Sequence, residues 1–291
     1  MCPENDDIYG SAPRPCASGK SNVREFVATD ATIPAFVINL DRDVARWQDI
    51  SSALTRLGVP YERIPAIDAK KRMTLIRRVI RREFHFAPAN RPMKAGEIGC
   101  YLSHIAALKR IVRQNLPMAV IFEDDAAFGE CFQNFYRRDL PHFLMKTDIV
   151  KFEGIHYAHT SKSSISLVKG ETAQLVVPLK PALGSAAYAV TRKGAMELIR
   201  ALSVADRPLD HKLVYYDRHG IDFAETQPFL VTQAAYESSI ELRSLDAPPL
   251  QPAERFRQGL ASIGRGAKRI AYVAKLLVKR RLLGTKSPSV A

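Results

Sequence analysis

The sequence predicts an α/β fold, and two stretches carry this prediction. Residues 33–67 alternate an apolar segment, a helical pattern and a second apolar segment, and a strand–helix–strand unit of this length joins parallel strands. Residues 119–122 form an uninterrupted apolar run, which is typical of a buried strand. Glu123, Asp124 and Asp125 follow that run directly. Ligands of open α/β sheets bind outside the carboxyl ends of strands, so this stretch marks the expected site.

Each element of the first unit has its own signal. The strand at 33–40 is mostly apolar, and the helix at 44–57 repeats apolar residues at helical spacing. Gly58 is the expected end of that helix, and the second short strand follows at 61–67. Further along, the sequence predicts helices at 98–114, 128–144 and 195–202, a short helix from Pro208, and strands at 147–152, 174–179 and 184–190. Residues 223–231 close the expected ordered core.

Length and composition bound the class of protein. The 291 residues, 46% of them hydrophobic, suffice for one large domain or two small ones. No apolar run is long enough to span a membrane, and residues 1–30 lack the apolar core of a secretory signal, so we expect a cytoplasmic protein. The four cysteines, Cys2, Cys16, Cys100 and Cys131, lack zinc-like spacing and are expected to be free thiols.

The net charge is concentrated near the C-terminus. Residues 255–291 hold ten Lys/Arg and no acid, and the whole chain has a formal net charge of +13. Most of the excess positive charge therefore belongs to a tail, which argues against a nucleic-acid binder and for contact with an anionic surface. We predict a disordered segment at 1–30, an α/β domain at 31–245 and a basic amphipathic tail at 246–291.

The tail has the pattern of an amphipathic helix. Apolar residues recur at alternating steps of four and three between Phe256 and Leu277, including Ala267, Ile270 and Ala274, and basic residues flank them. This composition is typical of a helix lying on an anionic membrane surface, the interpretation we favour. Docking on the α/β domain and pairing with another chain are the open alternatives. The tail lacks the interleaved aromatic residues of a surface that stacks nucleic-acid bases.

The acidic triplet needs partners. Each ionised carboxylate costs several kcal/mol to bury alone, so Glu123, Asp124 and Asp125 cannot all be buried without compensation. Strand-end carboxylates that converge on one point are natural ligands for a hard divalent cation. The alternative is that Glu123 and Asp124 cap a loop or pair with nearby arginines.

Five blocks of sequence occur in order over about residues 33–240. The blocks are Phe36–Arg42 with Arg46, Gly96–Cys100 with Ser103 and His104, Phe122–Ala126, Gly184–Val190 with Gly194 and Ala195, and Pro208–Asp210 with Gln227 and Pro228. Taken in this order, they resemble glycosyltransferase family 25, the lipooligosaccharide galactosyltransferase-like proteins.

This resemblance implies a GT-A-like fold, a Rossmann-related mixed sheet flanked by helices. It implies a nucleotide-sugar donor such as a UDP-sugar, a divalent metal (Mn²⁺ or Mg²⁺), and transfer of galactose or another hexose to a lipopolysaccharide- or lipooligosaccharide-type glycan or glycolipid. We assign donor contacts to Asn39, Leu40, Asp41, Arg42, Arg46, Glu97, Gly99, Ser103, His104 and Asp124, and acceptor contacts to Gly184, Ser185 and Tyr188.

The same resemblance places a metal at the acidic triplet. A divalent ion there would stabilise the negative charge that develops on the leaving diphosphate. Asp125 is the first choice of metal ligand and Glu123 the second. Asp124 points to the opposite side of an extended chain, so we expect it to contact ribose, sugar or a basic side chain.

An inverting transfer, which the resemblance implies, needs a group that accepts the proton of the acceptor hydroxyl. Such a step is typically worth about 10²–10⁴-fold in rate. Asp210 is the candidate base, and His211 is a weaker substitute. Asp210 also lies at a predicted helix start, where a carboxylate is an ordinary cap.

Two other functions stay open. A nucleotidyltransferase of related fold would use similar acids but needs a glycine-rich phosphate loop after the first strand, and residues 39–42 contain no glycine. A catalytically degenerate glycosyltransferase fold, kept as a binding protein, is disfavoured by the intact Glu123–Asp125 triplet.

Overall fold

The structure is a computed structural model of the 291-residue chain. It describes residues 32–71, 74, 93–154, 164–234, 267–274 and 278. The segment 1–30 and most of the tail, for which the sequence predicts disorder and an amphipathic helix, lie outside the described residues. The predicted domain boundaries therefore stay predictions.

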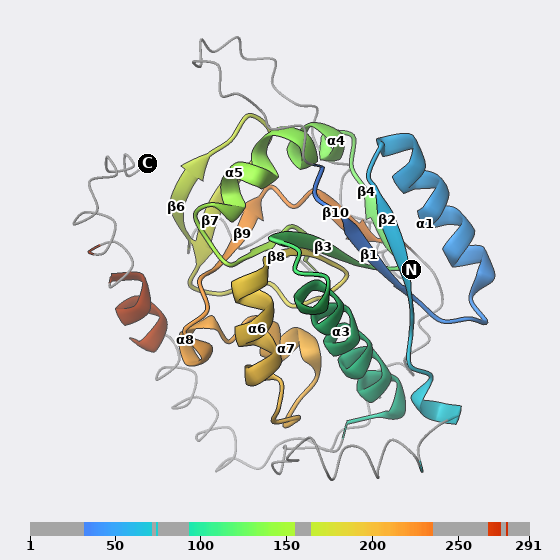
Figure 1. Cartoon of the computed structure of the whole chain (residues 1–291). Helices are drawn as coiled ribbons and strands as arrows, with labels where there is room; N and C mark the ends of the chain where they lie inside the picture. The colour runs from blue at the N-terminus through green and yellow to red at the C-terminus, as the bar shows by residue number, and fades with distance from the viewer. Residues whose placement is uncertain are drawn as a thin grey trace, which may run out of the picture.

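An eight-stranded mixed sheet forms the centre of the molecule, in the order β2-β1-β3-β8-β5-β9-β7-β6, and a two-stranded sheet pairs β10 with β4 (Figure 1). The predicted mixed sheet flanked by helices is confirmed. The strands are β1 Ala35–Asn39, β2 Tyr61–Pro65, β3 Met118–Glu123, β4 Ala126–Phe128, β5 Ile149–Lys151, β6 Ser164–Lys169, β7 Gln174–Pro178, β8 Ala187–Thr191, β9 Phe223–Gln227 and β10 Val231–Gln233.

Helices cover the sheet on both sides. Figure 1 shows α3, α6 and α7 gathered on one side and α4 and α5 on the other, with α1 beside β2 at one end. The helices are α1 Val44–Leu57, α3 Ala95–Arg113, α4 Phe132–Asn134, the π-helical turn η1 Phe135–Asp139, α5 Leu140–Leu144, α6 Arg192–Ala201, α7 Leu209–Leu213 and α8 Tyr216–His219.

The first three strands position the site. β1 pairs in parallel with β2 and also with β3, where Ile38 lies opposite Glu123. The predicted parallel unit is therefore confirmed. Because the carboxyl ends of parallel strands meet at one edge of a sheet, the loops after Asn39, Pro65 and Glu123 converge. β8 runs antiparallel to β3 on its other side and brings the preceding segment, residues 184–186, to the same edge.

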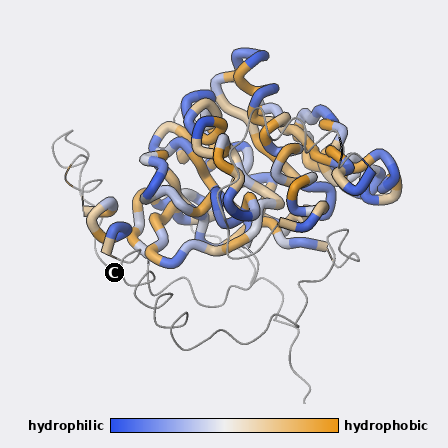
Figure 2. Tube along the Cα trace, turned by 90° about the horizontal axis from the view of Figure 1, so that it is seen from below, coloured by the Kyte–Doolittle hydropathy of each residue, from blue (hydrophilic) through white to orange (hydrophobic). Residues whose placement is uncertain are grey.

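The core beneath this edge is aromatic. Phe122 of β3 lies 6.0 Å from Phe132 and 6.1 Å from Phe152 between ring centroids, and all three rings are fully buried. Burying one such side chain is worth about 1.5–3 kcal/mol. Figure 2 shows hydrophobic segments running through the folded body and hydrophilic segments on its outer bends. A tightly packed layer under β3 gives the strand-end carboxylates a rigid base.

Some predicted elements differ from the structure. The helix predicted at 128–144 begins only at Phe132, because residues 126–128 pair with β10 instead. β6 was not predicted, although its first four residues alternate polar and apolar side chains as a half-buried strand does. Cys131 is disulfide-bonded, so the prediction of four free thiols is wrong for this residue. Sequence spacing alone does not show which cysteines the fold brings together. Cys100 is free and half-buried.

The described part of the tail, residues 267–274, docks on the α/β domain. Tyr272 donates a hydrogen bond to Asp222 Oδ1 (2.7 Å), Arg269 donates to the Leu179 carbonyl (3.1 Å), and Val273 is buried. This is the docking alternative, and it uses a different face from the predicted stripe. Ala267, Ile270 and Ala274 of that stripe are exposed. Within the described residues, no helix combines the length and apolar character needed to cross a membrane.

Candidate active site

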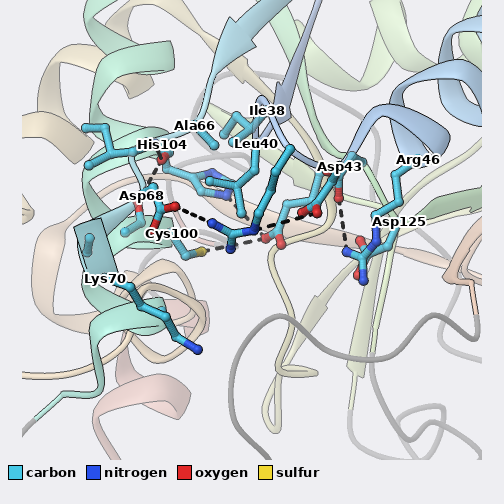
Figure 3. Close-up of a pocket in the computed structure, with 18 of the residues that line it drawn as sticks. Ile38, Leu40, Asp43, Arg46, Ala66, Asp68, Lys70, Cys100, His104 and Asp125 are labelled. Atoms are coloured by element: carbon cyan, nitrogen blue, oxygen red, sulfur yellow. Dashed lines mark hydrogen bonds and ion pairs between the residues drawn. The ribbon is translucent and has the colours of Figure 1, made fainter. Parts of the chain in front are cut away.

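A cavity of about 210 Å³ opens at the carboxyl ends of the parallel strands (Figure 3). The loop after β1, the loop after β2, the first three turns of α3 and the acidic triplet at the end of β3 form its walls. The lining residues are Ile38, Leu40, Arg42, Asp43, Arg46, Ala66–Lys70, Gly96, Gly99, Cys100, Ser103, His104, Glu123–Asp125, Gln233 and Ala234. The structure thus brings six of the nine predicted donor residues other than Asp124, and the whole triplet, to one cavity.

Asp124 is held by basic and amide groups. Its Oδ2 accepts a hydrogen bond from Asn39 Nδ2 (2.7 Å), and its Oδ1 accepts one from Arg46 (3.3 Å). Burial nevertheless raises the pKa of Asp124 above its usual value, because these partners only partly offset desolvation. Of the roles considered for Asp124, ordering a basic side chain is the one that these contacts match.

Glu123 faces the opposite way, toward α3 and β8. Its Oε1 accepts a hydrogen bond from Ser185 Oγ (2.5 Å) and lies 3.2 Å from His104 Nε2 and 3.9 Å from Cys100 Sγ. Desolvation raises the pKa of Glu123, but the contacts with His104 and Ser185 outweigh it and hold the pKa below its usual value. The carboxylate is therefore oriented and ionised.

Asp125 is the unsatisfied member of the triplet. Its Oδ1 is buried and accepts no hydrogen bond from the described residues. Burial, with the neighbouring charges of Glu123 and Asp124, raises the pKa of Asp125 to about 7. A buried oxygen without a partner, in a field of like charge, fits a hard cation, because such an ion removes both penalties at once. The residues present therefore fit the divalent metal expected at Asp125.

The loop after β1 divides into lining and supporting residues. Leu40, Arg42 and Arg46 line the cavity. Asn39 is buried behind them, where its Oδ1 accepts two hydrogen bonds from Arg63 (2.9 and 2.7 Å) while its Nδ2 holds Asp124. Asp41 is exposed and pairs with Arg63 (2.9 Å), away from the cavity lining.

The start of α3 packs closely against the loop after β2. A Cβ on Gly99 would lie 2.5 Å from the Ile67 carbonyl oxygen, so only glycine allows this approach. Ser103 Oγ accepts a hydrogen bond from the Ile67 amide (2.8 Å) and donates one to the Gly99 carbonyl (2.6 Å). Glu97 caps the helix by accepting from the Lys94 amide (2.8 Å) and does not line the cavity.

The predicted acceptor residues lie behind Glu123 and do not line the cavity. Gly184 has a φ of 110°, which side-chain-bearing residues rarely adopt, and its Cα lies against the Glu153 carboxylate. Ser185 contacts Glu123 as described above, and the Tyr188 hydroxyl lies 3.1 Å from His104 Nδ1. Ser185 and Tyr188 thus orient Glu123 and His104.

Asp210 lies near the same group of side chains. Its Oδ1 accepts a hydrogen bond from the His211 amide (2.9 Å), and Pro208 occupies the cap position of α7. The carboxylate also acts on buried neighbours, since its negative charge contributes to raising the pKa values of Cys100 and Glu153. The fold therefore brings Asp210 to the edge of the site, although it does not line the cavity.

Sequence reasoning missed a buried charged group behind residues 184–186. Lys151 donates hydrogen bonds to the Glu153 and Leu183 carbonyls, Glu153 Oε2 accepts from the Ala186 amide (3.3 Å), and Glu225 accepts from the Ala182 amide (2.9 Å). Burial raises the pKa values of Glu153 and Glu225 to about 7. The signal available in the sequence was Lys151, a charged residue inside the strand predicted at 147–152.

A cavity at the carboxyl ends of parallel strands, with acids facing basic side chains, places the chain among α/β proteins whose ligand site is built from strand-end loops. The model of glycosyltransferase family 25, described as an LPS biosynthesis protein family, matches residues 32–213. The chain belongs to this family, and the predicted resemblance is confirmed.

Individual relatives agree with this assignment. A glycosyltransferase 25 family member of Drosophila melanogaster is 27% identical over 193 residues, covering 63% of this chain and 31% of its own length. The lipooligosaccharide biosynthesis protein lic2B of Haemophilus influenzae is 27% identical over 169 residues, with 56% and 61% covered. Procollagen galactosyltransferase 1-A of Xenopus laevis is 25% identical over 227 residues, with 69% and 35% covered. The chain thus spans about a third of the length of these animal relatives.

Proposed function

We propose that this chain is a glycosyltransferase that moves a hexose, galactose in the first instance, from a UDP-sugar to a lipopolysaccharide- or lipooligosaccharide-type glycan. Membership of family 25 supports the class of reaction. The relatives named for lipooligosaccharide biosynthesis and procollagen galactosylation support the sugar and the kind of acceptor.

The unsatisfied Oδ1 of Asp125 is the observation that carries the proposal. It is buried in a cavity that Arg42, Arg46 and Lys70 also line. Asp125 favours a cation, and the basic side chains beside it favour an anion. Together they suit a metal–diphosphate group. When bound, Mn²⁺ or Mg²⁺ would supply positive charge to the diphosphate as it leaves.

The chain's own residues would divide the remaining work. Asp125 would hold the metal with Glu123 as second ligand, while His104 and Ser185 keep the Glu123 carboxylate in place. Asp124 would keep Arg46 turned toward the cavity, where its guanidinium can neutralise a phosphate oxygen. We propose that the reaction inverts configuration and that Asp210 accepts the acceptor's proton.

A panel of nucleotide sugars, tested for turnover with Mn²⁺ and after metal removal by EDTA, tests the function. We expect UDP-hexose hydrolysis, and faster transfer when a lipooligosaccharide core fragment is added. Pyrophosphate release from a nucleoside triphosphate and a sugar phosphate would instead identify a nucleotidyltransferase. Metal-dependent donor binding with no turnover on any acceptor would identify a degenerate binding protein.

The role of Asp210 is tested by Asp210→Asn. Loss of a general base should lower kcat by about 10²–10⁴-fold and leave the Kd of the donor unchanged. Because Asp210 also accepts a hydrogen bond from the His211 amide, its loss could act on α7 instead. A parallel fall in donor affinity and Tm would assign it that structural role and move the base elsewhere.

We propose that the tail brings the enzyme to an anionic membrane surface, where a lipid-linked acceptor would lie. The exposed Ala267, Ile270 and Ala274, with Lys268 beside them, support this. Replacing Lys268, Lys279 and Arg280 by Glu leaves the docked Tyr272 and Val273 unchanged. Full-length protein should bind anionic vesicles at low salt and the triple variant should not, while equal binding by both would exclude the tail as the contact.

The place of action is part of the same proposal. Nucleotide-sugar chemistry on a lipid carrier fits the cytoplasmic face of the membrane, whereas the disulfide at Cys131 is a feature more common in oxidising compartments. Alkylation of protein taken rapidly from cells distinguishes the two. A Cys131 thiol that is free in cells supports the cytoplasmic location, and an oxidised Cys131 contradicts it.

A further inference from the structure

A thiol, an imidazole and a carboxylate meet on one wall of the cavity. The side chains are Cys100, His104 and Glu123, and one potential ligand atom of each lies within 4.8 Å of the other two. All three residues line the cavity. We propose that they form a site for a borderline-soft cation, Zn²⁺ above all, which shares the Glu123 carboxylate with the hard-cation position at Asp125 and differs from it by the thiol and the imidazole. This claim concerns metal binding and does not depend on the proposed transferase function.

The fold presents the three ligands together. Cys100 and His104 are four residues apart on α3, and this spacing places two side chains on one face of a helix. Glu123 reaches the same point from the end of β3, across the cavity wall. Figure 3 shows Cys100 and His104 near one another and apart from Asp125, which lies at the other side of the drawn group.

The distances are close to those that zinc requires. Ordinary Zn–S, Zn–N and Zn–O lengths in a tetrahedral site separate the nitrogen and oxygen ligands by about 3.4 Å and the sulfur and oxygen ligands by about 3.6 Å. The His104 Nε2–Glu123 Oε1 distance is 3.2 Å and the Cys100 Sγ–Glu123 Oε1 distance is 3.9 Å. These two separations differ from the zinc values by a few tenths of an ångström, and the sulfur and the imidazole ligand atom lie within 4.8 Å of one another.

Neighbouring groups already orient the ligands. The Tyr188 hydroxyl lies 3.1 Å from His104 Nδ1, which leaves Nε2 facing Glu123 and the thiol. Ser185 Oγ holds the Glu123 carboxylate at 2.5 Å. Partners of this kind behind a metal-binding histidine or carboxylate fix its orientation and raise its affinity for the ion.

Ligand chemistry separates the two cation positions. A thiolate, an imidazole and a carboxylate favour Zn²⁺ or Co²⁺, whereas oxygen ligands alone favour Mg²⁺ or Mn²⁺. On binding, the Cys100 thiol loses its proton to solvent and its sulfur bonds to the metal, so one proton is released for each ion. Three protein ligands leave a fourth position for water from the cavity.

Cobalt titration of the purified full-length chain tests the site, because a cobalt–thiolate bond has its own charge-transfer absorption. We expect this absorption to saturate at one Co²⁺ per chain, to disappear when Zn²⁺ is added and to persist in excess Mg²⁺. Cys100→Ser should abolish it, while Asp125→Asn, the matched control at the other position, should keep it. Absence of the band, its persistence in Cys100→Ser, or its loss in a folded Asp125→Asn would overturn the proposal.

A second measurement uses the wild-type protein alone, so it does not depend on the folding of a variant. Alkylation of Cys100 is followed by mass spectrometry of the peptide that carries it, with and without one equivalent of Zn²⁺. We expect Zn²⁺ to slow the modification at least tenfold and Mg²⁺ to leave it unchanged. Equal rates with and without Zn²⁺ would contradict binding at the thiol.

Discussion

Two regions of the molecule place an aspartate in the interior and treat it in opposite ways. Asp139, at the end of η1, is buried and accepts hydrogen bonds from the amides of Glu171, Thr172 and Ala173 (2.8, 2.8 and 3.2 Å). Asp125, after β3, has a buried Oδ1 with no partner among the described residues. The fold supplies hydrogen-bond donors to the Asp139 carboxylate. Oδ1 of Asp125 is left for a partner that the described residues do not supply.

The difference separates stability from function. The Asp139 carboxylate accepts hydrogen bonds from the amides of residues 171–173 and so holds that turn against η1. The carboxylate therefore stabilises the native chain. The charge of Asp125 meets Glu123 and Asp124, which raise its pKa together with burial. A carboxylate whose charged form is disfavoured by its surroundings, and which lies beside a cavity, is a candidate for binding a ligand rather than for stabilising the fold.

The largest effect should come from Asp125→Asn. Removing a metal ligand should lower metal-dependent donor turnover by at least about 100-fold, the upper end of the loss seen when outer partners of a metal site are removed. Turnover by the purified variant at saturating Mn²⁺ measures this, with circular dichroism to check the fold. Asp139→Asn is the matched control, and its folded fraction should keep the wild-type kcat. Near-normal activity of Asp125→Asn would remove the metal assignment.

The next effect concerns stability and should fall on the other aspartate. Asp139→Ala leaves three amides, of which that of Ala173 is buried, without their acceptor and should lower the free energy of unfolding by about 2–3 kcal/mol. Urea denaturation at neutral pH measures this difference. If Asp139→Ala is as stable as the wild type, the two aspartates do not differ in the way described.

A pH effect on stability should come from Asp125, as it should from Glu153 and Glu225, whose pKa values are raised to the same range. The pKa of Asp125 is about 7 in the folded chain against an ordinary value near 3.8, so between these values the folded state holds a proton that the unfolded state has lost. The free energy of unfolding therefore falls as pH rises through this window. In metal-free protein, Asp125→Asn should make that fall smaller and raise Tm at pH 8, while Glu153 and Glu225 keep their contribution. An unchanged pH profile of Tm would show that Asp125 is not destabilised by its neighbours.

The smallest effect should come from the surface next to Asp139. Arg138 pairs with Glu171 at 3.2 Å, but both side chains are more than half exposed. Such pairs contribute about 0–1 kcal/mol, so Arg138→Ala should change the free energy of unfolding far less than Asp139→Ala. An effect as large as that of Asp139→Ala would show that the surface pair, rather than the buried carboxylate, holds the turn.

Much of the fold could be predicted because local patterns and burial agree. The apolar run at 119–122 became β3, and the strand–helix–strand pattern at 33–67 became two parallel strands around α1. β4 and β10 were missed because each is three residues long and exists only through pairing with the other.

The sequence predicted which residues form the site, but it did not predict which atoms they contact. The sequence selected the acidic triplet and the Gly96–His104 block, and the structure places both on one cavity. Asn39, Glu97 and Tyr188 lie behind that cavity, where they hold other side chains. A sequence does not reveal whether a polar residue faces a cavity or supports one that does, because the answer depends on burial from distant elements.

The sequence by itself determined the α/β class, the strand that carries the three acids and the family, because these follow from hydrophobic periodicity and from ordered motifs. Only the tertiary structure decided how the three neighbouring acids differ. Asn39 and Arg46 reach Asp124, His104 and Ser185 reach Glu123, and no described residue reaches Oδ1 of Asp125. These partners come from β1, α1, α3 and the segment before β8, so their distances are set by packing of the whole sheet and not by the order of residues along the chain.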